Sequence, residues 1–386
     1  MSRSRPGNGH RGLDRVVSRR RLLTGGAAAT AALAVSGGVL GADLLSGASR
    51  PASRRLVESQ PAAETAAPRQ RTVPTPAPTS APTPDPRYPD GPFVPGPDTR
   101  LWGVFEPGAP SNIAALAGVE RAVGNPQAIH WYQSWSGPGS ELDPVRLNNV
   151  REYGALPMIS WEPAHAGWGT DQPPYALARL AAGDHDDYAR SWARGIRDHG
   201  GPVVIRFAHE MNHGHFAWAA GVNGNTPEQY VAAWRHVRQI FLDEGAQNAS
   251  FSWSPNIAYD GTTPFDQLYP GDEHVDWIGL SGFNGGSDLP WGGWLEFGPM
   301  FLPSYEVLVG YGKPMMITEV ACTENGGDKA AWIRRAFTDA LPNVMPRFQV
   351  VCWFNENVLV DWRVQSSPSS ADAFVETAGT WRQRTP

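Results

Sequence analysis

The stretch Pro202-Val-Val-Ile-Arg-Phe-Ala-His-Glu-Met-Asn212 is the part of this sequence that decides the fold. A second stretch of the same kind, Lys313-Pro-Met-Met-Ile-Thr-Glu-Val-Ala321, follows further along the chain. Each begins with a short apolar run, which is typical of a strand that is buried on both faces. Each run leads to a glutamate, Glu210 in the first and Glu319 in the second. Two carboxylates placed at the ends of buried strands are the pair of groups that hydrolysis of a glycosidic bond requires.

Eight short apolar runs, bounded by Gly, Pro or polar residues, divide the second part of the chain. They cover residues 101–105, 128–132, 156–161, 203–208, 250–253, 275–280, 315–318 and 348–353. Helical patterns lie between them, and the clearest spans residues 226–241, with Thr226 as the N-cap and Pro227 at the first helical position. This alternation favours a single (β/α)8 TIM barrel. A doubly wound sheet is the alternative, but it would show a Gly-rich phosphate turn after the first strand, and the sequence has none there.

Charge separates the front of the chain from the rest. Residues 1–99 hold 13 Arg and 7 Asp or Glu, a net charge of +6, whereas residues 100–386 hold 19 Lys or Arg and 31 Asp or Glu, a net charge of −12. An acidic domain is a poor partner for phosphate backbones, so we expect no binding of nucleic acid.

The N-terminal region predicts export. Ser18-Arg-Arg-Arg-Leu-Leu23 precedes a weakly apolar run and resembles a twin-arginine signal, so we interpret residues 1–48 as a signal sequence. An uncleaved membrane anchor is the alternative. Residues 49–98 are rich in Pro, Thr, Ala and Ser, which predicts a disordered linker. Residues 99–386 then form one catalytic domain. We expect a secreted, extracellular monomer whose contact with a membrane is limited to the signal.

One segment of the chain also matches a metal-binding motif. His209-Glu-Met-Asn-His213 matches the H-E-x-x-H signature of zinc proteases, and His215 adds a third imidazole. That signature works on a helix, where residues i and i+4 share a face. Here it follows a strand pattern, in which the two histidines would lie ~13 Å apart. We therefore expect no metal and no other cofactor.

Four separated blocks carry a resemblance to a known family. Residues 206–212, 223–236, 275–284 and 313–319 together resemble glycoside hydrolase family 26. The resemblance implies a (β/α)8 barrel and retaining endo-hydrolysis of a β-linked polysaccharide, without a catalytic metal. The polysaccharide would be β-1,4-mannan, mixed-linkage β-1,3-1,4-glucan or β-1,3-xylan.

The resemblance also implies roles for individual residues. Glu210 corresponds to the general acid/base and Glu319 to the nucleophile, while His209 corresponds to a histidine that contacts the sugar where cleavage occurs. Asn212 is a further polar group that could position a sugar hydroxyl. A retaining pair needs one protonated and one ionised carboxyl at ~5–5.5 Å.

Tryptophans supply candidate sugar platforms, because a flat indole can stack on a sugar ring. Of the 16 Trp in the chain, several fall at strand ends or in the loops that follow: Trp131, Trp135, Trp161, Trp168, Trp218, Trp291, Trp294 and Trp353. We predict Trp353 as the platform in the cleavage subsite, with Trp161 and Trp218 as weaker candidates.

Three positions depart from the family pattern. His213 and His215 stand where relatives usually have Gly and Trp, and Phe283 stands where many have a tyrosine that donates a hydrogen bond to the nucleophile. These departures support an alternative function, a weakly active or inactive barrel that binds polysaccharide outside the cell. The favoured function is an exported endo-β-glycanase acting on mannan or mixed-linkage glucan. Cys322 and Cys352 could form a disulfide or remain two buried thiols.

Overall fold

A computed structural model of the 386-residue chain describes residues 91–93, 96, 98–290 and 293–383. The signal predicted for residues 1–48, and nearly all of the linker predicted for residues 49–98, lie outside the described residues. In the part of the chain that is described, no helix is both long and apolar enough to cross a membrane.

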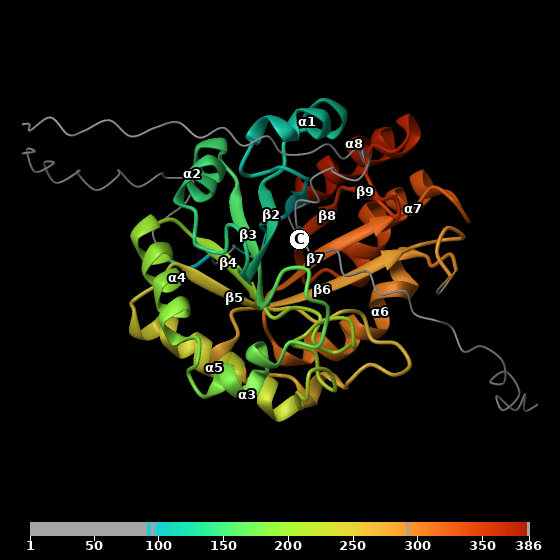
Figure 1. Ribbon diagram of the computed structural model, residues 1–386. Helices are drawn as coiled ribbons and strands as arrows, with labels where there is room; N and C mark the ends of the chain where they lie inside the picture. The colour runs from blue at the N-terminus through green and yellow to red at the C-terminus, as the bar shows by residue number, and fades with distance from the viewer. Residues whose placement is uncertain (1–90, 94–95, 97, 291–292, 384–386) are drawn as a thin grey trace, which may run out of the picture. The chain divides into compact units, whose positions relative to one another are not determined.

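Eight parallel strands close into a barrel in which each strand pairs with its neighbours in chain order, and β8 pairs with β1 (Figure 1). The strands are β1 (Leu101–Phe105), β2 (Ala128–Ser136), β3 (Leu156–His165), β4 (Val203–Phe207), β5 (Ala249–Trp253), β6 (Trp277–Asn284), β7 (Met315–Cys322) and β8 (Phe348–Phe354). This confirms the predicted (β/α)8 barrel and excludes the doubly wound sheet.

Helices surround the barrel and lie outside its strands (Figure 1). The α-helices are α1 (Ala117–Val123), α2 (Pro144–Tyr153), α3 (Leu177–Ala181), α4 (Asp186–His199), α5 (Pro227–Asp243), α6 (Phe297–Leu308), α7 (Lys329–Arg335) and α8 (Pro368–Gln383). Shorter turns of helix are η1 (Ile113–Leu116), η2 (Pro173–Tyr175), η3 (Phe265–Gln267), η4 (Asp272–His274) and η5 (Val309–Tyr311), and a π-helix, η6 (Ala336–Val344), follows α7. A small hairpin of β9 (Asn357–Val358) and β10 (Val360–Asp361) follows β8.

The start of α5 follows the sequence prediction. The Thr226 side chain accepts a hydrogen bond from the backbone of Gln229, and the Gln229 side chain accepts one from the backbone of Thr226. Pro227 occupies the first position of the helix, where no backbone donor is needed. This reciprocal cap fixes the end of the loop that connects β4 to α5, and that loop carries Glu210.

The amino end of the barrel is filled with apolar side chains. The cluster consists of Ala128, Leu156, Met158, Val204, Trp277, Met316, Val350 and Cys352. Phe93 closes this end, because its ring stacks on Trp277 at 5.4 Å and its backbone N–H donates to Ser250 Oγ at 2.9 Å. Phe93 belongs to the segment predicted as linker, so the packed domain begins before the predicted boundary at residue 99.

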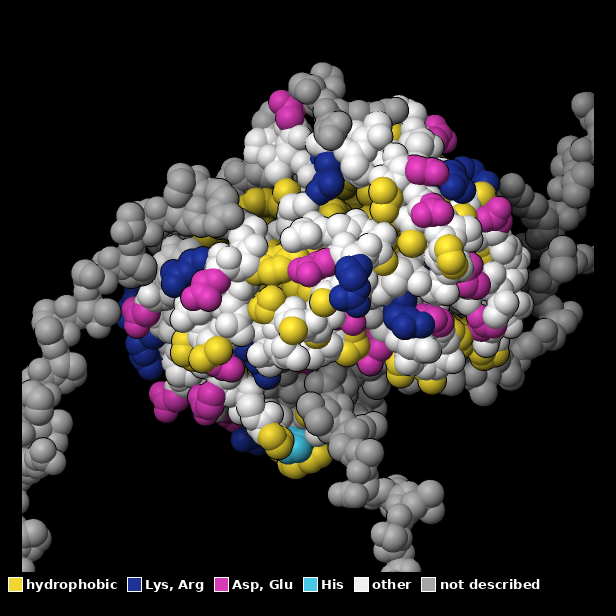
Figure 2. All heavy atoms as spheres, turned by 90° about the horizontal axis from the view of Figure 1, so that it is seen from above, with side chains coloured by type: hydrophobic (Ala, Val, Ile, Leu, Met, Phe, Trp, Pro, Cys, Tyr) yellow, Lys and Arg dark blue, Asp and Glu magenta, His cyan; other side chains and the backbone are white. Residues whose placement is uncertain are grey.

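On the face shown in Figure 2, acidic and basic side chains are interspersed among polar and apolar ones. Neither sign of charge forms a continuous field on that face. This pattern differs from the basic stripe that typically marks a nucleic-acid interface.

Candidate active site

Glu210 lies just beyond the carboxyl end of β4, on a tightly curled backbone. Ala208 and Glu210 both have positive φ angles, 45° and 52°, which are uncommon for residues other than glycine and cluster at functional sites. The Glu210 backbone N–H donates to the carbonyl of Ser254, at 2.7 Å. The curl and this bond to the chain after β5 together hold the Glu210 side chain at the mouth of the barrel.

Glu319 reaches the same mouth through an irregularity in β7. Leu280 of β6 pairs with Ile317, but the next residue, Ser281, pairs with Glu319. Thr318 is therefore skipped in the register, as in a β-bulge, which re-aims the side chains that follow it. As a result Glu319 lies level with Ser281 and faces the residues of β4.

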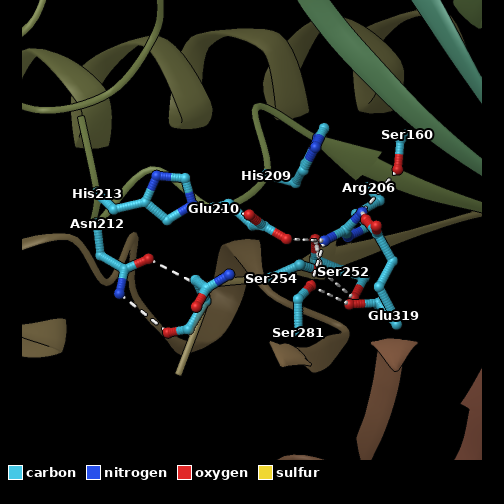
Figure 3. Close-up of polar contacts among 12 residues, drawn as sticks. Ser160, Arg206, His209, Glu210, Asn212, His213, Ser252, Ser254, Ser281 and Glu319 are labelled. Carbon is cyan, nitrogen blue, oxygen red and sulfur yellow. Dashed lines mark hydrogen bonds and ion pairs between the residues drawn. The ribbon is translucent and has the colours of Figure 1, made fainter. Parts of the chain in front are cut away.

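Arg206, which is fully buried, connects the two glutamates (Figure 3). Its Nη1 donates to Glu319 Oε1 and to Ser160 Oγ, the latter at 2.9 Å. Its Nη2 donates to Ser281 Oγ at 2.6 Å and lies 3.5 Å from Glu210 Oε1. One guanidinium thus contacts both carboxylates, and this network of charges and hydrogen bonds brings the two predicted catalytic residues together.

A tyrosine that the sequence analysis did not single out also binds Glu319. The hydroxyl of Tyr132, on β2, donates to Glu319 Oε2 at 2.6 Å. Burial, and then the charge of Glu319, raise the pKa of Tyr132 well above its usual range, so it keeps its proton and remains a donor. Phe283 instead packs against Phe354 and Trp362. The departure noted at Phe283 therefore does not leave Glu319 without a tyrosine hydroxyl.

The two carboxyls have opposite pKa shifts. Burial and the nearby charge of Glu210 raise the pKa of Glu319, although Arg206 and Tyr132 oppose this rise. Burial would also raise the pKa of Glu210, but the hydrogen bond with His213, and then the charge of Arg206, bring it well below its usual range. In the free protein, the neighbours of Glu210 therefore favour its ionised form.

His213 is the closest polar neighbour of Glu210 (Figure 3). Its Nε2 lies 2.7 Å from Glu210 Oε2, and both side chains are buried. The ring of His215 lies 4.4 Å from that of His213, and the His215 backbone N–H donates to His213 Nδ1 at 3.3 Å. Both histidines that depart from the family pattern therefore adjoin the predicted acid/base.

His209 lies beside this pair but makes a different set of contacts. Burial, and then the charge of Arg206, lower its pKa well below the usual range, so its ring is neutral. The ring packs between Tyr132 and Trp218, and its Nδ1 has no hydrogen-bond partner within the described residues. This unpaired nitrogen is compatible with the predicted contact to a sugar, which stays a prediction.

The histidines of the H-E-x-x-H motif do not share a helix. The residues after β4 run in turns, and His213 is bound to Glu210. Across the described part of the chain, no group of three or more His, Cys, Asp or Glu side chains is placed to hold a metal ion.

Asn212 has a structural role, which corrects its prediction as a sugar-binding residue. Its side-chain Nδ2 donates to the carbonyl of Asn256 at 2.9 Å, and its Oδ1 accepts from the Asn256 backbone N–H at 2.9 Å. Asn212 is also buried. Its amide therefore clamps the loop after β4 to the loop after β5.

Trp353 and Trp161 are not sugar platforms, so these two predictions are wrong. Trp353 packs outside the barrel against Trp332 of α7 and Phe374 of α8, and it is only 1% exposed. Trp161 is likewise buried, against Trp192 of α4. Since side chains alternate across a strand, these two indoles point away from the barrel mouth and cannot stack on a sugar.

Trp218 does lie near the site, but its ring is covered. The indole stacks on Phe216 at 4.6 Å and packs against His209, and its Nε1 donates to the His209 carbonyl at 2.6 Å. It is 2% exposed. Trp218 therefore supports His209, and the predicted role as a platform is wrong.

Among the tryptophans that the structure describes, Trp168 offers the most open face, whereas Trp291 lies outside the described residues. Trp168 lies in the loop after β3 and is 57% exposed. The ring of His165 stacks on its other face, with ring centres 4.0 Å apart and planes 14° apart. Gln172 accepts from the His165 backbone N–H and donates to the carbonyls of His165 and Gly169, so the loop is held in place.

Glu162, near the end of β3, is a third buried carboxyl that the sequence analysis missed. Ser134 Oγ donates to its Oε2 at 2.9 Å, whereas no described group pairs with its Oε1. Burial raises its pKa to about 7, and the charge of Glu319 acts in the same direction. The sequence signal was available, since a glutamate directly follows the apolar run at residues 156–161.

The two cysteines are free thiols, and both are buried. Cys352 belongs to the apolar cluster at the amino end of the barrel, whereas the Cys322 thiol accepts a hydrogen bond from the Asn284 side chain at 3.3 Å. Of the two open alternatives, the structure therefore has two buried thiols.

Comparisons with known proteins agree with this geometry. The model of glycosyl hydrolase family 26 matches residues 170–294, which include Glu210. Endoglucanase H of Acetivibrio thermocellus is 33% identical over 255 residues, which cover 65% of this chain and 27% of that protein. The beta-1,3-xylanase TXYA of a Vibrio species is 31% identical over 110 residues, 28% of this chain and 22% of that protein. The chain thus matches about a quarter of the length of these curated relatives.

Solved structures show the same fold. A family 26 β-mannanase from Bacteroides ovatus superposes with a TM-score of 0.53, over 74% of this chain and 90% of that one. Its sequence identity is 18%, so this likeness concerns the barrel alone.

Proposed function

Since the chain belongs to glycoside hydrolase family 26, we propose that it is a retaining endo-β-glycanase that uses Glu210 and Glu319 as its catalytic pair. The observation that carries the proposal is the contact of Arg206 with both carboxylates at the mouth of the barrel. Active sites of TIM barrels lie at this end, where the strands finish. A buried charge cluster of this kind is expensive unless it serves a purpose.

Glu319 suits the role of nucleophile. Its Oε1 accepts from Arg206 and its Oε2 accepts from Tyr132, so both oxygens are fixed on the barrel wall. In the first step Glu319 would attack the anomeric carbon, while Glu210 gives its proton to the departing glycosidic oxygen. In the second step Glu210 would take a proton from water, and this water would displace Glu319 from the sugar.

The substrate class follows from the relatives. Their names describe an endoglucanase, a β-1,3-xylanase and β-mannanases, which all act on β-linked polysaccharides. For this chain we propose β-1,4-mannan or mixed-linkage β-1,3-1,4-glucan. Among the described aromatic residues, Trp168 in the loop after β3 is the one most exposed and so best able to stack on a sugar of the bound chain.

Release of reducing ends by the purified full-length chain tests this function. The substrates are glucomannan, galactomannan, barley β-glucan and β-1,3-xylan, and the control variants are Glu210→Gln and Glu319→Ala. We expect hydrolysis of one polymer and a loss of about 10⁴-fold or more in each variant, the scale seen when a catalytic nucleophile is removed. Azide should restore cleavage to Glu319→Ala by attacking the anomeric carbon in place of the carboxylate. The product is a glycosyl azide of inverted configuration, which has no new reducing end and is therefore detected by mass spectrometry of the shortened chains.

The second candidate function is polysaccharide binding with weak or no hydrolysis. It is favoured by the neighbours of Glu210, which lower its pKa and so favour the ionised form in the free protein, although the acid role needs a proton. If the parent chain binds a polymer in affinity electrophoresis but releases no reducing ends between pH 4 and pH 8, this function replaces the first.

Export by the twin-arginine route remains a further proposal, which rests on Ser18-Arg-Arg-Arg-Leu-Leu23. Replacement of Arg19 and Arg20 by Lys should stop the accumulation of the protein outside the producing cell. Unchanged accumulation would contradict the proposal.

A further inference from the structure

The pair formed by His213 and Glu210 is buried and asymmetric. Glu210 Oε2 has a short contact with His213 Nε2, at 2.7 Å, whereas Oε1 has only the longer contact with Arg206, at 3.5 Å. The exposed fractions of Glu210 and His213 are 7% and 6%, so bulk water competes little for this bond. The two oxygens of this carboxyl are therefore not equivalent.

The second ring nitrogen of His213 identifies which atom carries the proton. The His215 backbone N–H donates to Nδ1 of His213, so Nδ1 is an acceptor and carries no proton. In the neutral imidazole the proton then lies on Nε2, the nitrogen that faces Glu210. Nε2 is therefore a donor to Glu210 Oε2, and the main chain at His215 fixes this tautomer.

We propose that His213 is a positioning residue for Glu210, which holds Oε2 as a hydrogen-bond acceptor and leaves Oε1 to carry the catalytic proton. This inference rests on the proposed function of Glu210 as the acid/base. Oε2 can accept the bond from His213 whether the carboxyl is protonated on Oε1 or ionised. The side chain therefore needs no rearrangement between the two steps of hydrolysis.

Glu210 loses one proton and regains one proton in each cycle of hydrolysis. When the glycosidic bond breaks, the proton of Oε1 passes to the departing oxygen and Glu210 becomes a carboxylate. When water attacks the glycosyl-enzyme, Oε1 receives the proton of that water. His213 keeps its Nε2 proton throughout and is not itself the acid.

A donor of this kind also sets the pH range over which Glu210 works. A hydrogen bond donated to a carboxylate favours the ionised form, so His213 makes Glu210 lose its proton at a lower pH than it otherwise would. The other titratable or charged groups around the pair are Tyr132 on β2, Arg206 on β4, His209 and His215 after β4, Tyr259 after β5 and Glu319 on β7. None of the hydrogen bonds described for these side chains ends on Glu210 Oε2.

The test compares His213→Phe with His213→Gln in the full-length chain. The ring of His213 packs against Phe216, with ring centres 5.6 Å apart, and Phe keeps this contact but has no donor, whereas Gln can donate to Glu210. The measurement is the pH dependence of kcat/KM on the best polymer of the four. Because hydrolysis requires protonated Glu210, the alkaline limb should move up by about one pH unit in His213→Phe. It should stay near the parent position in His213→Gln.

A second measurement tests Glu210 as a general base, the role in which its carboxyl must be ionised. An aryl glycoside with a dinitrophenol leaving group needs little acid assistance, so its kcat reports the attack of water, which requires ionised Glu210. The acid limb of this kcat profile should also move up by about one unit in His213→Phe. A side chain that only fills space would move neither limb.

The outcomes separate this inference from the proposed function. Coincident pH profiles for the parent and both variants, with intact thermal unfolding, overturn the role of His213. Equal shifts in His213→Phe and His213→Gln also overturn it, because the donor would then not matter. If Glu210→Gln retains full activity, the proposed function itself fails, and the role of His213 fails with it.

Discussion

The two ends of the barrel are built from the same eight strands, but one end is packed with apolar side chains and the other holds buried charges. The amino end is apolar, with Met316, Val350 and the stacked pair of Phe93 and Trp277 filling the space inside the strands. The carboxyl end holds buried charge, centred on Arg206. Burial of an apolar side chain stabilises the fold by itself, whereas a buried charge destabilises it unless an opposite charge or a hydrogen bond lies next to it. The comparison indicates that the polar end is maintained for chemistry at some cost to stability.

Among the substitutions that test this difference, Arg206→Met is expected to have the largest effect on stability and hydrolysis. It removes the cation that contacts both glutamates, so the free energy of unfolding should fall by about 3–5 kcal/mol and hydrolysis should become hard to detect. The matched change at the other end is Met316→Ala, which should lower the free energy of unfolding by about 2–5 kcal/mol but leave kcat/KM unchanged where the protein is folded.

Chemical denaturation and reducing-end release, measured on both variants, check this contrast. Hydrolysis by Arg206→Met at the parent rate would show that the buried charges are only structural. Lost hydrolysis in a folded Met316→Ala would show that the two ends are not independent.

The pH dependence of the free energy of unfolding measures how much the buried charge of Glu162 destabilises the fold. The Glu162 pKa of about 7 in the folded chain lies above the usual value of 4.5, so the folded chain binds this proton more tightly than the unfolded chain does. Its stabilising contribution is complete below pH 4.5 and is lost as the pH rises to about 7, which lowers the free energy of unfolding by about 3 kcal/mol.

Glu162→Gln cannot ionise and should remove this slope. The variant should match the parent near pH 4 and be more stable than the parent at pH 8. Glu376→Gln, on the surface of α8, is the control and should change the free energy of unfolding by less than about 1 kcal/mol. Parallel curves for Glu162→Gln and the parent would contradict the assigned pKa.

Tyr132→Phe tests a single hydrogen bond at the polar end. The loss of the bond to Glu319 Oε2 should lower kcat/KM about 10- to 100-fold, since a hydrogen bond to a charged group contributes about 1.5–3 kcal/mol. The matched control is Tyr153→Phe, which removes a bond of the same length, 2.6 Å, to Glu120, away from the site. Equal kinetics for the two variants would mean that Tyr132 does not act on the nucleophile.

The sequence predicts the barrel and its two glutamates because these depend on local signals, the apolar runs and the residues that end them. It predicts less well which face of a strand points inward. The eighth run ends at Trp353, and the next residue, Phe354, is also large. Only the closed barrel determines that Phe354 faces Phe105 while Trp353 faces the helices. The contact of Tyr132 with Glu319 joins β2 to β7, so it depends on closure of the barrel and on the irregular register of β7.

Trp168→Ala should have the smallest effect, and it concerns the rim of the polar end. The open face of Trp168 can stack on a sugar, and its other face is supported by His165. An aromatic contact of this kind contributes about 0.5–1.5 kcal/mol, so KM for the polymer should rise about two- to tenfold with little change in kcat. Trp168→Phe should retain most of the affinity. On oligosaccharides too short to reach the loop after β3, the parent and Trp168→Ala should be equal. An equal loss on short and long substrates would instead mean that Trp168 acts on the cleavage site itself and not on a distant sugar of the bound chain.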